Sequence, residues 1–436
     1  MKETRRHFLK RLAFSGAGDR KAVVEEADHV FLNIFLRGGA DTLNMLIPYG
    51  DDDYYRARPT IGIKSGGTIS KPSADGDLAV KLDDFYALHP RMAPLRRIYL
   101  EGRLAFVQAV GSDNVSGSHF EAQDQMEHGE AYRRRLQGGW LGRHLFYRPG
   151  RGSVSSPLTA VAFGNTIPEV LRGAPTVAAL QSVDQVELKG GSAAVLEDLS
   201  MLYGASRDDL GRAGADTLHL LDRIASMKAS RSFLNSGSGG VEYPDCALAG
   251  SLAEVARLVR AELGLNVACV DHGGWDTHFI QGGAQGLQAG SIDELARSLD
   301  AFDKDLARDN LRSRVTVLVM TEFGRRSYEN SSLGTDHGRA FSLFIISDRV
   351  RGGRVIGEWP GLAEVSDPLH EPKKVLRRIP GLEEDLDVGP AGLSVLIDYR
   401  DVLYALTETL LGNRQVDKVF PGFKPGSGKN MAELFI

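Results

Sequence analysis

Cysteine is scarce in this chain, where Cys246 and Cys269 are the only two among 436 residues. They make no CxxC pair, so the sequence shows neither a disulfide framework nor a zinc finger. Long apolar runs are also missing: none approaches the roughly 20 residues needed to cross a bilayer, and we expect no transmembrane segment. Basic charge is not in excess, because 57 acidic residues outnumber 52 basic ones and leave a net charge of −5. A nucleic-acid partner is therefore not expected.

A dinucleotide-binding fingerprint is absent too. The first expected strand is followed by RGGAD at residues 37–41 rather than by G-x-G-x-x-G, which argues against a nicotinamide or flavin oxidoreductase. There is no internal repeat. What is present, 42% hydrophobic and 25% charged residues, is the composition of a folded globular protein with a large core.

The N-terminus carries an export-like motif. Residues 4–10 read TRRHFLK, which has the form of a twin-arginine signal. The apolar stretch behind it is short, because the charged residues Asp19, Arg20 and Lys21 interrupt it. We expect the twin-arginine translocase as a partner and a periplasmic or exported protein if this short signal works, and a cytoplasmic protein otherwise.

Short apolar runs alternate with stretches whose apolar residues recur every three or four positions. Continuous runs are typical of strands covered on both faces of a parallel sheet, and we expect strands at 30–36, 104–110, 159–163, 266–271, 315–320 and 341–346. The other spacing predicts helices at 92–101, 120–128, 252–263, 292–309 and 399–411. This order favours an α/β fold, a doubly wound and mostly parallel sheet flanked by helices.

The chain divides into two parts on this interpretation. Residues 1–28 form the signal-like segment, and residues 29–436 form a single α/β domain. Within that domain, residues 172–240 are mainly helical in pattern and poor in chemical motifs. We expect them to be a helical insertion.

Carboxylates and imidazoles gather near the ends of the expected strands, where open α/β sheets bind ligands. Such a set could hold one or two divalent cations, with zinc favoured by imidazole and manganese, magnesium or calcium by carboxylate. Each short motif alone is more often a capped turn, and it is the clustering that favours metal. The candidate metal ligands are Asp41, Asp276, His278, Glu322, Asp336 and His337.

Three further residues are candidates for catalysis. Ser118, with His119 beside it, precedes the expected helix 120–128, where free N–H groups favour an anion and an activated hydroxyl. Ser118 and Glu121 also fit a capping box, so nucleophile and helix cap both stay open. Arg37 could clamp an anionic ester oxygen or could pair with a carboxylate.

The chain resembles a bacterial domain-of-unknown-function family, number 1501, over about residues 30–412. The matching motifs are FLRGGAD at 35–41, SHFEAQD at 118–124, GWLGR at 139–143, GWDTH at 274–278, EFGR at 322–325, TDHG at 335–338 and DYRD at 398–401. Members of this family typically carry twin-arginine signals and look like relatives of the alkaline phosphatase and sulfatase superfamily. The resemblance therefore implies an alkaline phosphatase or sulfatase-like fold.

The resemblance also implies roles, taken by chain order. Asp41 resembles the first metal carboxylate, Ser118 the nucleophile, and Asp276 with His278 the middle ligand pair. Glu322 resembles the next carboxylate and His337 the last histidine.

Two functions from different classes are compatible with these motifs. The first is a metal-dependent hydrolase of phosphate or sulfate esters, acting on an anionic small-molecule or polymer ester. The second is a catalytically inactive, exported binding or assembly protein with a sulfatase-like fold. It is favoured by Phe323, which follows Glu322 where many relatives place a histidine.

Overall fold

The computed structural model describes most of the chain beyond the N-terminal segment. The described residues are 29–114, 116–131, 136–148, 156–186, 193–206, 208–229, 240–362, 392–426, 431 and 434–436. The export-like motif at residues 4–10 lies outside them.

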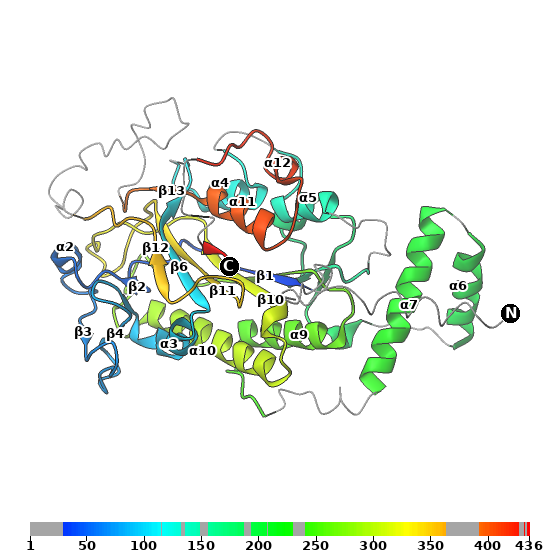
Figure 1. Cartoon of the computed structure of the whole chain (residues 1–436), viewed down its shortest axis with the longest axis horizontal. Coiled ribbons are helices and arrows are strands. Elements are labelled where there is room, and N and C mark those ends of the chain that lie inside the picture. Colours follow the sequence, from blue (N-terminus) through cyan, green and yellow to red (C-terminus); the bar gives the residue numbers. More distant parts are fainter. Residues whose placement is uncertain are drawn as a thin grey trace, which may run out of the picture.

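A nine-stranded sheet forms the centre of the described structure (Figure 1). Its order is β12-β6-β11-β10-β1-β9-β7-β8, with β13 beside β6. The strand bounds are β1 Val30–Leu36, β6 Leu104–Gly111, β7 Ala160–Phe163, β8 Ala178–Leu180, β9 Val267–His272, β10 Val315–Thr321, β11 Phe341–Ile346, β12 Arg354–Ile356 and β13 Ile397–Asp398. All six strands expected from the sequence are present, within one residue at each end.

One long strand runs against its neighbours. β11 pairs antiparallel with both β10 and β6, whereas β10, β1, β9, β7 and β8 pair in parallel. The sheet is therefore mostly parallel, as predicted. The reversal matters for the site, because the residues before β11 lie at the sheet edge where the parallel strands end.

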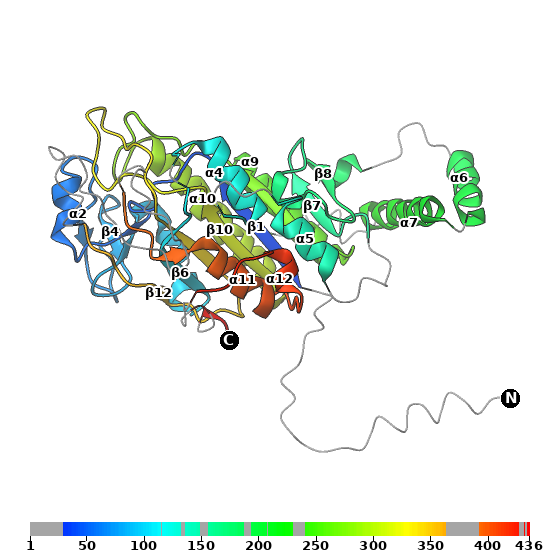
Figure 2. The ribbon, with the colours of Figure 1, turned by 90° about the horizontal axis from the view of Figure 1, so that it is seen from above.

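Helices cover both faces of the sheet (Figures 1 and 2). One face carries α3, α9 and α10, and the other carries α4, α5, α11 and α12. Along β1, Leu32 and Ile34 pack into the first core, and Phe31 and Phe35 pack into the second. The helix bounds are α3 Arg96–Leu100, α4 His119–His128, α5 Trp140–Tyr147, α9 Ala247–Ala261, α10 Leu287–Arg308, α11 Tyr399–Thr409 and α12 Val416–Val419.

Two smaller units extend the main body. A four-stranded sheet, with α2 (Asp52–Ala57) nearby, contains β2 Leu46–Ile47, β3 Ser65–Gly66, β4 Ala79–Lys81 and β5 Ala87–Leu88. At the opposite end of the molecule, α6 (Ala193–Ala205) and α7 (Asp209–Ala229) project from the body (Figures 1 and 2). These helices fall inside the segment expected to be a helical insertion, and its status as an inserted unit stays a prediction.

Within the described part of the chain, no helix combines the length and the apolar composition that crossing a bilayer requires.

Candidate functional site

The candidate residues reach one edge of the sheet by three routes. β1, β9 and β10 are parallel, so the loops that follow them leave from the same edge. The loop after β6 leads to α4, whose first residue is His119. His337 precedes β11, and the antiparallel direction of β11 brings it to this edge as well.

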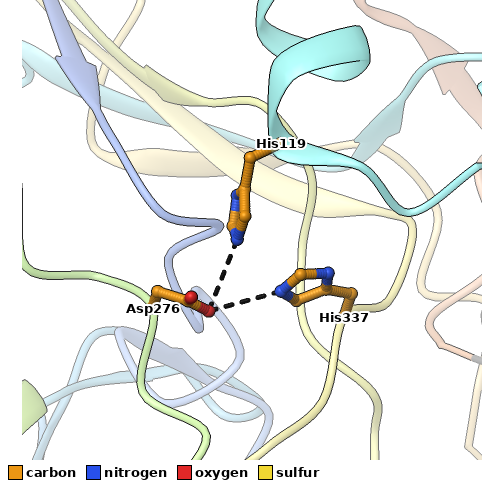
Figure 3. A group of neighbouring side chains, drawn as sticks. All are labelled: His119, Asp276 and His337. Atoms are coloured by element: carbon orange, nitrogen blue, oxygen red, sulfur yellow. Dashed lines mark hydrogen bonds and ion pairs between the residues drawn. The ribbon is translucent and has the colours of Figure 1, made fainter.

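Three side chains from three of these loops converge on one point (Figure 3). His119, Asp276 and His337 each offer a ligand atom, and these atoms all lie within 4.8 Å of one another. His119 Nε2 is 3.4 Å and His337 Nε2 is 3.3 Å from Asp276 Oδ1. His278 joins them, since its Nε2 lies 3.0 Å from the same oxygen. We call these four side chains the histidine–aspartate cluster.

Each imidazole of the cluster is oriented by a hydrogen bond at its other nitrogen. His119 Nδ1 lies 2.8 Å from Glu322 Oε1, His278 Nδ1 lies 3.1 Å from Asp336 Oδ1, and His337 Nδ1 lies 2.7 Å from a backbone carbonyl, that of Gly117. A carbonyl and an ionised carboxylate can only accept, so each Nδ1 carries the donated hydrogen. When neutral, all three rings therefore present an Nε2 lone pair toward Asp276.

The short distance between the His278 and His337 rings indicates whether the cluster could hold a cation. His278 Nε2 and His337 Nε2 are 2.9 Å apart. Burial lowers the pKa of His337, which favours its neutral form. Two lone pairs at this distance repel unless a proton or a cation lies between them. His119 Nε2 is also buried without a hydrogen-bond partner among the described atoms. Inward imidazole nitrogens with an oxygen partner on the other nitrogen are typical of metal sites, so the cluster fits a divalent cation.

One cation of the protein itself lies at the edge of the cluster. Arg325 Nη2 is 2.6 Å from Asp276 Oδ1, and the Arg325 side chain is fully buried. Partial burial raises the pKa of Asp276, but the hydrogen bond and charge of Arg325 outweigh it and lower that pKa to about 2. Arg325 also donates to the carbonyls of Gly39 and Thr335. It thus ties together three of the loops that form the site.

Glycine allows these loops to approach each other closely. Gly38 has a φ of +121°, and a Cβ there would lie 2.5 Å from the backbone N of Asp276. A Cβ at Gly334 would collide with the carbonyl of His278. Larger residues at either position would push the Asp276 and His278 loop away from its neighbours.

Asp41 lies apart from the cluster, although the sequence made it a candidate ligand. Its side chain is fully buried against the fully buried Arg58, with Nη1 2.6 Å from Oδ2 and Nη2 3.0 Å from Oδ1. Gln281 Nε2 donates to Oδ2 at 2.6 Å. Both carboxylate oxygens are therefore occupied, and this geometry gives Asp41 a structural role.

Arg37 is occupied in the same way. Its Nη2 lies 3.0 Å from a Glu127 oxygen and 3.0 Å from an Asp271 oxygen, while Nη1 donates to Gln123. The guanidinium carbon also lies 4.2 Å from the centre of the Phe35 ring. This is the carboxylate-pairing alternative for Arg37, and it takes up both of the Nη atoms that the predicted clamp would use.

Glu322 and Asp336 lie one step behind the cluster. Glu322 is fully buried, and its Oε1 accepts from the Gly38 N–H at 2.9 Å and from Gln123 Nε2 at 2.8 Å in addition to His119. Although burial alone would raise it, these hydrogen bonds lower the pKa of Glu322. Both carboxylates, predicted as metal ligands, here hold imidazole rings in position.

Ser118 lies at the N-cap position of α4. Its side chain makes no capping hydrogen bond, so the predicted capping box with Glu121 is not formed. Its neighbours in the chain both belong to the site: the Gly117 carbonyl accepts from His337, and His119 is a member of the cluster. Ser118 is thus adjacent in the chain to the cluster, and its hydroxyl makes no capping hydrogen bond to the helix.

Three residues important for this geometry were not among the sequence candidates. Arg58, Gln281 and Arg325 organise the loops through buried hydrogen bonds. Arg325 belongs to the matched EFGR motif, so only that motif could have suggested it. Arg58 and Gln281 stand in stretches with no chemical pattern.

Comparison with known proteins gives a family and some distant structural similarity. A family model described as "Protein of unknown function (DUF1501)" matches residues 28–373. No curated protein sequence matches significantly.

Among solved structures, Ps i-CgsB in complex with k-i-k-neocarrahexaose is 11% identical, with 89% of this chain and 72% of that chain covered and a TM-score of 0.35. A 2-O GAG sulfatase is 10% identical, covering 76% and 66% at a TM-score of 0.28. Alkaline phosphatase from the Antarctic bacterium TAB5 is 10% identical, covering 73% and 91% at a TM-score of 0.26.

Proposed function

Because the chain belongs to the DUF1501 family, whose description assigns no activity, we propose its function from the site itself: a metal-dependent hydrolase of phosphate or sulfate esters, of the alkaline phosphatase and sulfatase type. His119, Asp276, His278 and His337 would hold the metal, and Ser118 would be the nucleophile. The substrate would be an anionic small-molecule or polymer ester.

The observation that carries this proposal is the convergence of three Nε2 atoms on Asp276 Oδ1. Three imidazoles and one carboxylate are a ligand set that suits zinc, with manganese as the next choice. Magnesium and calcium prefer all-oxygen sites and fit less well. Glu322 and Asp336 support the metal indirectly, since outer partners of this kind orient the ring and raise its basicity.

A divalent cation in this position supplies Lewis acidity for an ester oxygen. Ser118 would supply the nucleophile: as its Oγ bonds to phosphorus or sulfur, the bond from that atom to the ester oxygen breaks, and this oxygen leaves with the hydroxyl proton as an alcohol. Water then cleaves the serine ester, which releases phosphate or sulfate and restores the hydroxyl. The N-terminal end of α4, a helix of 10 residues, favours the negative charge that builds up beside Ser118.

Metal binding is the first test. Asp276→Asn replaces a carboxylate by a neutral amide, and we expect metal affinity to fall on the order of 100-fold or more, because the only anionic ligand is lost. The measurement is zinc and manganese stoichiometry after dialysis, together with titration of the chelated protein. Asp293→Asn on α10 is the matched control, since Asp293 makes an exposed pair with Arg297. Equal metal content in Asp276→Asn and wild type would remove the cluster as the metal site.

A second function is favoured by two features of the same site. The Arg325 guanidinium lies 2.6 Å from Asp276 Oδ1, where it weakens the attraction for a metal cation. The Phe323 ring packs 4.9 Å from His119 and 4.8 Å from His337, centre to centre, in place of a further ligand. In this alternative the chain is an inactive, sulfatase-like binding or assembly protein, and a wild type that retains no metal would favour it.

Export through the twin-arginine route is proposed separately from the sequence at residues 4–10. We expect inefficient export, with much of the protein left in the cytoplasm, because charged residues cut the apolar stretch short. Cell fractionation of the full chain measures this, and a variant with Arg5→Lys and Arg6→Lys should remove the exported fraction. Complete export that depends on Arg5 and Arg6 would contradict the expected inefficiency.

A further inference from the structure

Two polar side chains beside the cluster have donors without acceptors. Arg339 Nε is buried and has no hydrogen-bond partner among the described atoms. The one hydrogen bond of the Arg339 guanidinium to a described residue runs from Nη2 to the Ser112 carbonyl and is 3.5 Å long, which is a weak contact. Arg37 and Arg58 at the same edge of the sheet both pair with carboxylates, whereas Arg339 makes no ion pair with any described residue.

Asn114 is the second of these side chains. Its Oδ1 accepts from the backbone N–H of Ser116 at 2.8 Å, which fixes the orientation of the amide. The remaining group, Nδ2, is buried and has no acceptor among the described atoms. The Asn114 amide nitrogen and the Arg339 Nε are thus buried donors without an acceptor, and leaving such a group unsatisfied costs about 1–3 kcal/mol.

Both side chains line one small cavity. Its wall also contains Gly117, Glu322 and Phe323, and its volume is about 10 Å³. That is room for one water-sized group, hence for one oxygen atom of a larger ligand. The cavity touches the loop that carries Ser118 and the residues that orient His119 and His337.

Among the described residues, the acidic side chains nearby make no hydrogen bond to Arg339 or to Asn114 Nδ2. Glu322 is a wall residue, but its oxygens accept from Gly38, Gln123, Thr321 and His119. Asp113 accepts from Gln125 Nε2 at 2.6 Å, and its charge attracts the Arg339 guanidinium without forming an ion pair with it among the described residues. A positive charge and a fixed N–H donor thus face the cavity with no acceptor between them.

We propose that Arg339 and Asn114 form an oxyanion pocket, which holds one non-bridging oxygen of the phosphoryl or sulfuryl group beside Ser118. This inference rests on the proposed function, and it moves the anion-binding role from Arg37 to Arg339. The N–H groups of Arg339 and Asn114 would donate hydrogen bonds to one anionic oxygen of the tetrahedral group. Binding of that oxygen would place the phosphorus or sulfur atom next to the loop that carries Ser118. A carboxylic ester substrate carries no anionic non-bridging oxygen, so we expect the pocket to favour phosphate and sulfate esters.

The test measures binding of inorganic phosphate and inorganic sulfate to the full chain, by calorimetry and by the rise in melting temperature. Wild type is expected to bind both ions. Arg339→Gln should bind at least tenfold more weakly, as expected for the loss of a charge-assisted hydrogen bond. Asn114→Asp keeps the acceptor that Ser116 uses but faces the ion with a negative charge, and it should lose as much. Arg297→Gln removes one exposed charge on α10 and should bind as wild type does.

Stability separates this role from a structural one. Without added anion, Arg339→Gln is expected to melt no lower than wild type, because a buried guanidinium with one long hydrogen bond stabilises little. With the same concentration of phosphate, wild type gains more stability than the variant. If Arg339→Gln does not fold, Arg339→Lys and Asn114→Asp decide: a several-fold loss of affinity in both supports the pocket.

The result that overturns the pocket is unchanged phosphate and sulfate affinity in Arg339→Gln and Asn114→Asp. If the wild type also binds zinc and cleaves esters, the pocket fails and the proposed hydrolase stands. If the wild type cleaves no ester but its phosphate affinity depends on Arg339, the hydrolase fails and the anion site stands. The two failures are thus distinguishable in one set of proteins.

Discussion

Ser118→Ala is expected to abolish ester cleavage while leaving the protein folded. The hydroxyl makes no capping hydrogen bond to α4, so its loss should change the free energy of unfolding by less than about 0.5 kcal/mol, the usual size of a surface substitution. Loss of the nucleophile should lower turnover by at least about 10³-fold. A panel of aryl phosphates and aryl sulfates, assayed with zinc or manganese present, measures the activity, and urea unfolding measures the stability.

Three further variants distinguish loss of the nucleophile from loss of a helix cap. Ser118→Thr keeps a hydroxyl and should retain part of the activity. Ser118→Asp keeps a capping group but cannot form the same ester, so it should be inactive. Ser251→Ala on α9 is the matched control, since Ser251 only donates to a helix carbonyl on the other face of the sheet. Ester cleavage that survives in Ser118→Ala, with only a lower melting temperature, would make Ser118 a structural cap.

The strands could be predicted closely because their burial leaves a simple trace in the sequence. Residues 30–36 and 341–346 were expected with the bounds that β1 and β11 have. Strand direction leaves no such trace. A parallel strand at 341–346 would put His337 at the opposite edge of the sheet from His278, and only the antiparallel pairing of β11 brings their Nε2 atoms to 2.9 Å.

The candidate site could be predicted in part, since motif spacing reports residue type but not the direction of a side chain. Asp276, His278 and His337 lie together and His119 joins them from α4, while their role as metal ligands stays a prediction. Glu322 carries the same signal as a ligand, a carboxylate after a strand, yet its oxygens orient a ring instead. Residues that bind a metal directly and residues that hydrogen-bond to those ligands are of the same types, so sequence alone does not tell the two roles apart.

Two further differences between the predicted and the observed site depend on contacts that no sequence motif reports. Asp41 also follows a strand, and its partner Arg58 lies 17 positions further along in a stretch with no motif. Arg339 follows the matched TDHG motif, but the missing acceptor of its Nε is a property of packing. The residue types alone do not show that the Asp41 carboxylate is fully hydrogen-bonded or that Arg339 Nε has no acceptor.

Asp41→Asn is expected to cause a large loss of stability. Asp41 and Arg58 are both fully buried, with two contacts of 2.6 and 3.0 Å. The substitution leaves the guanidinium buried without its countercharge, and breaking a pair of this kind costs about 3–5 kcal/mol. Urea unfolding measures the loss. Asp293→Asn, in an exposed pair, should change the free energy of unfolding by less than about 1 kcal/mol.

Metal content of the folded Asp41→Asn protein separates this structural role from the ligand role that the sequence suggested. Because both oxygens of Asp41 face Arg58 and Gln281, zinc stoichiometry should equal that of wild type at a temperature where the variant is folded. A second substitution, Arg58→Gln, should recover part of the lost stability, since it removes the unpaired charge. Asp41→Asn with wild-type stability and no bound metal would return Asp41 to the ligand set and leave Arg58 without the role assigned to it.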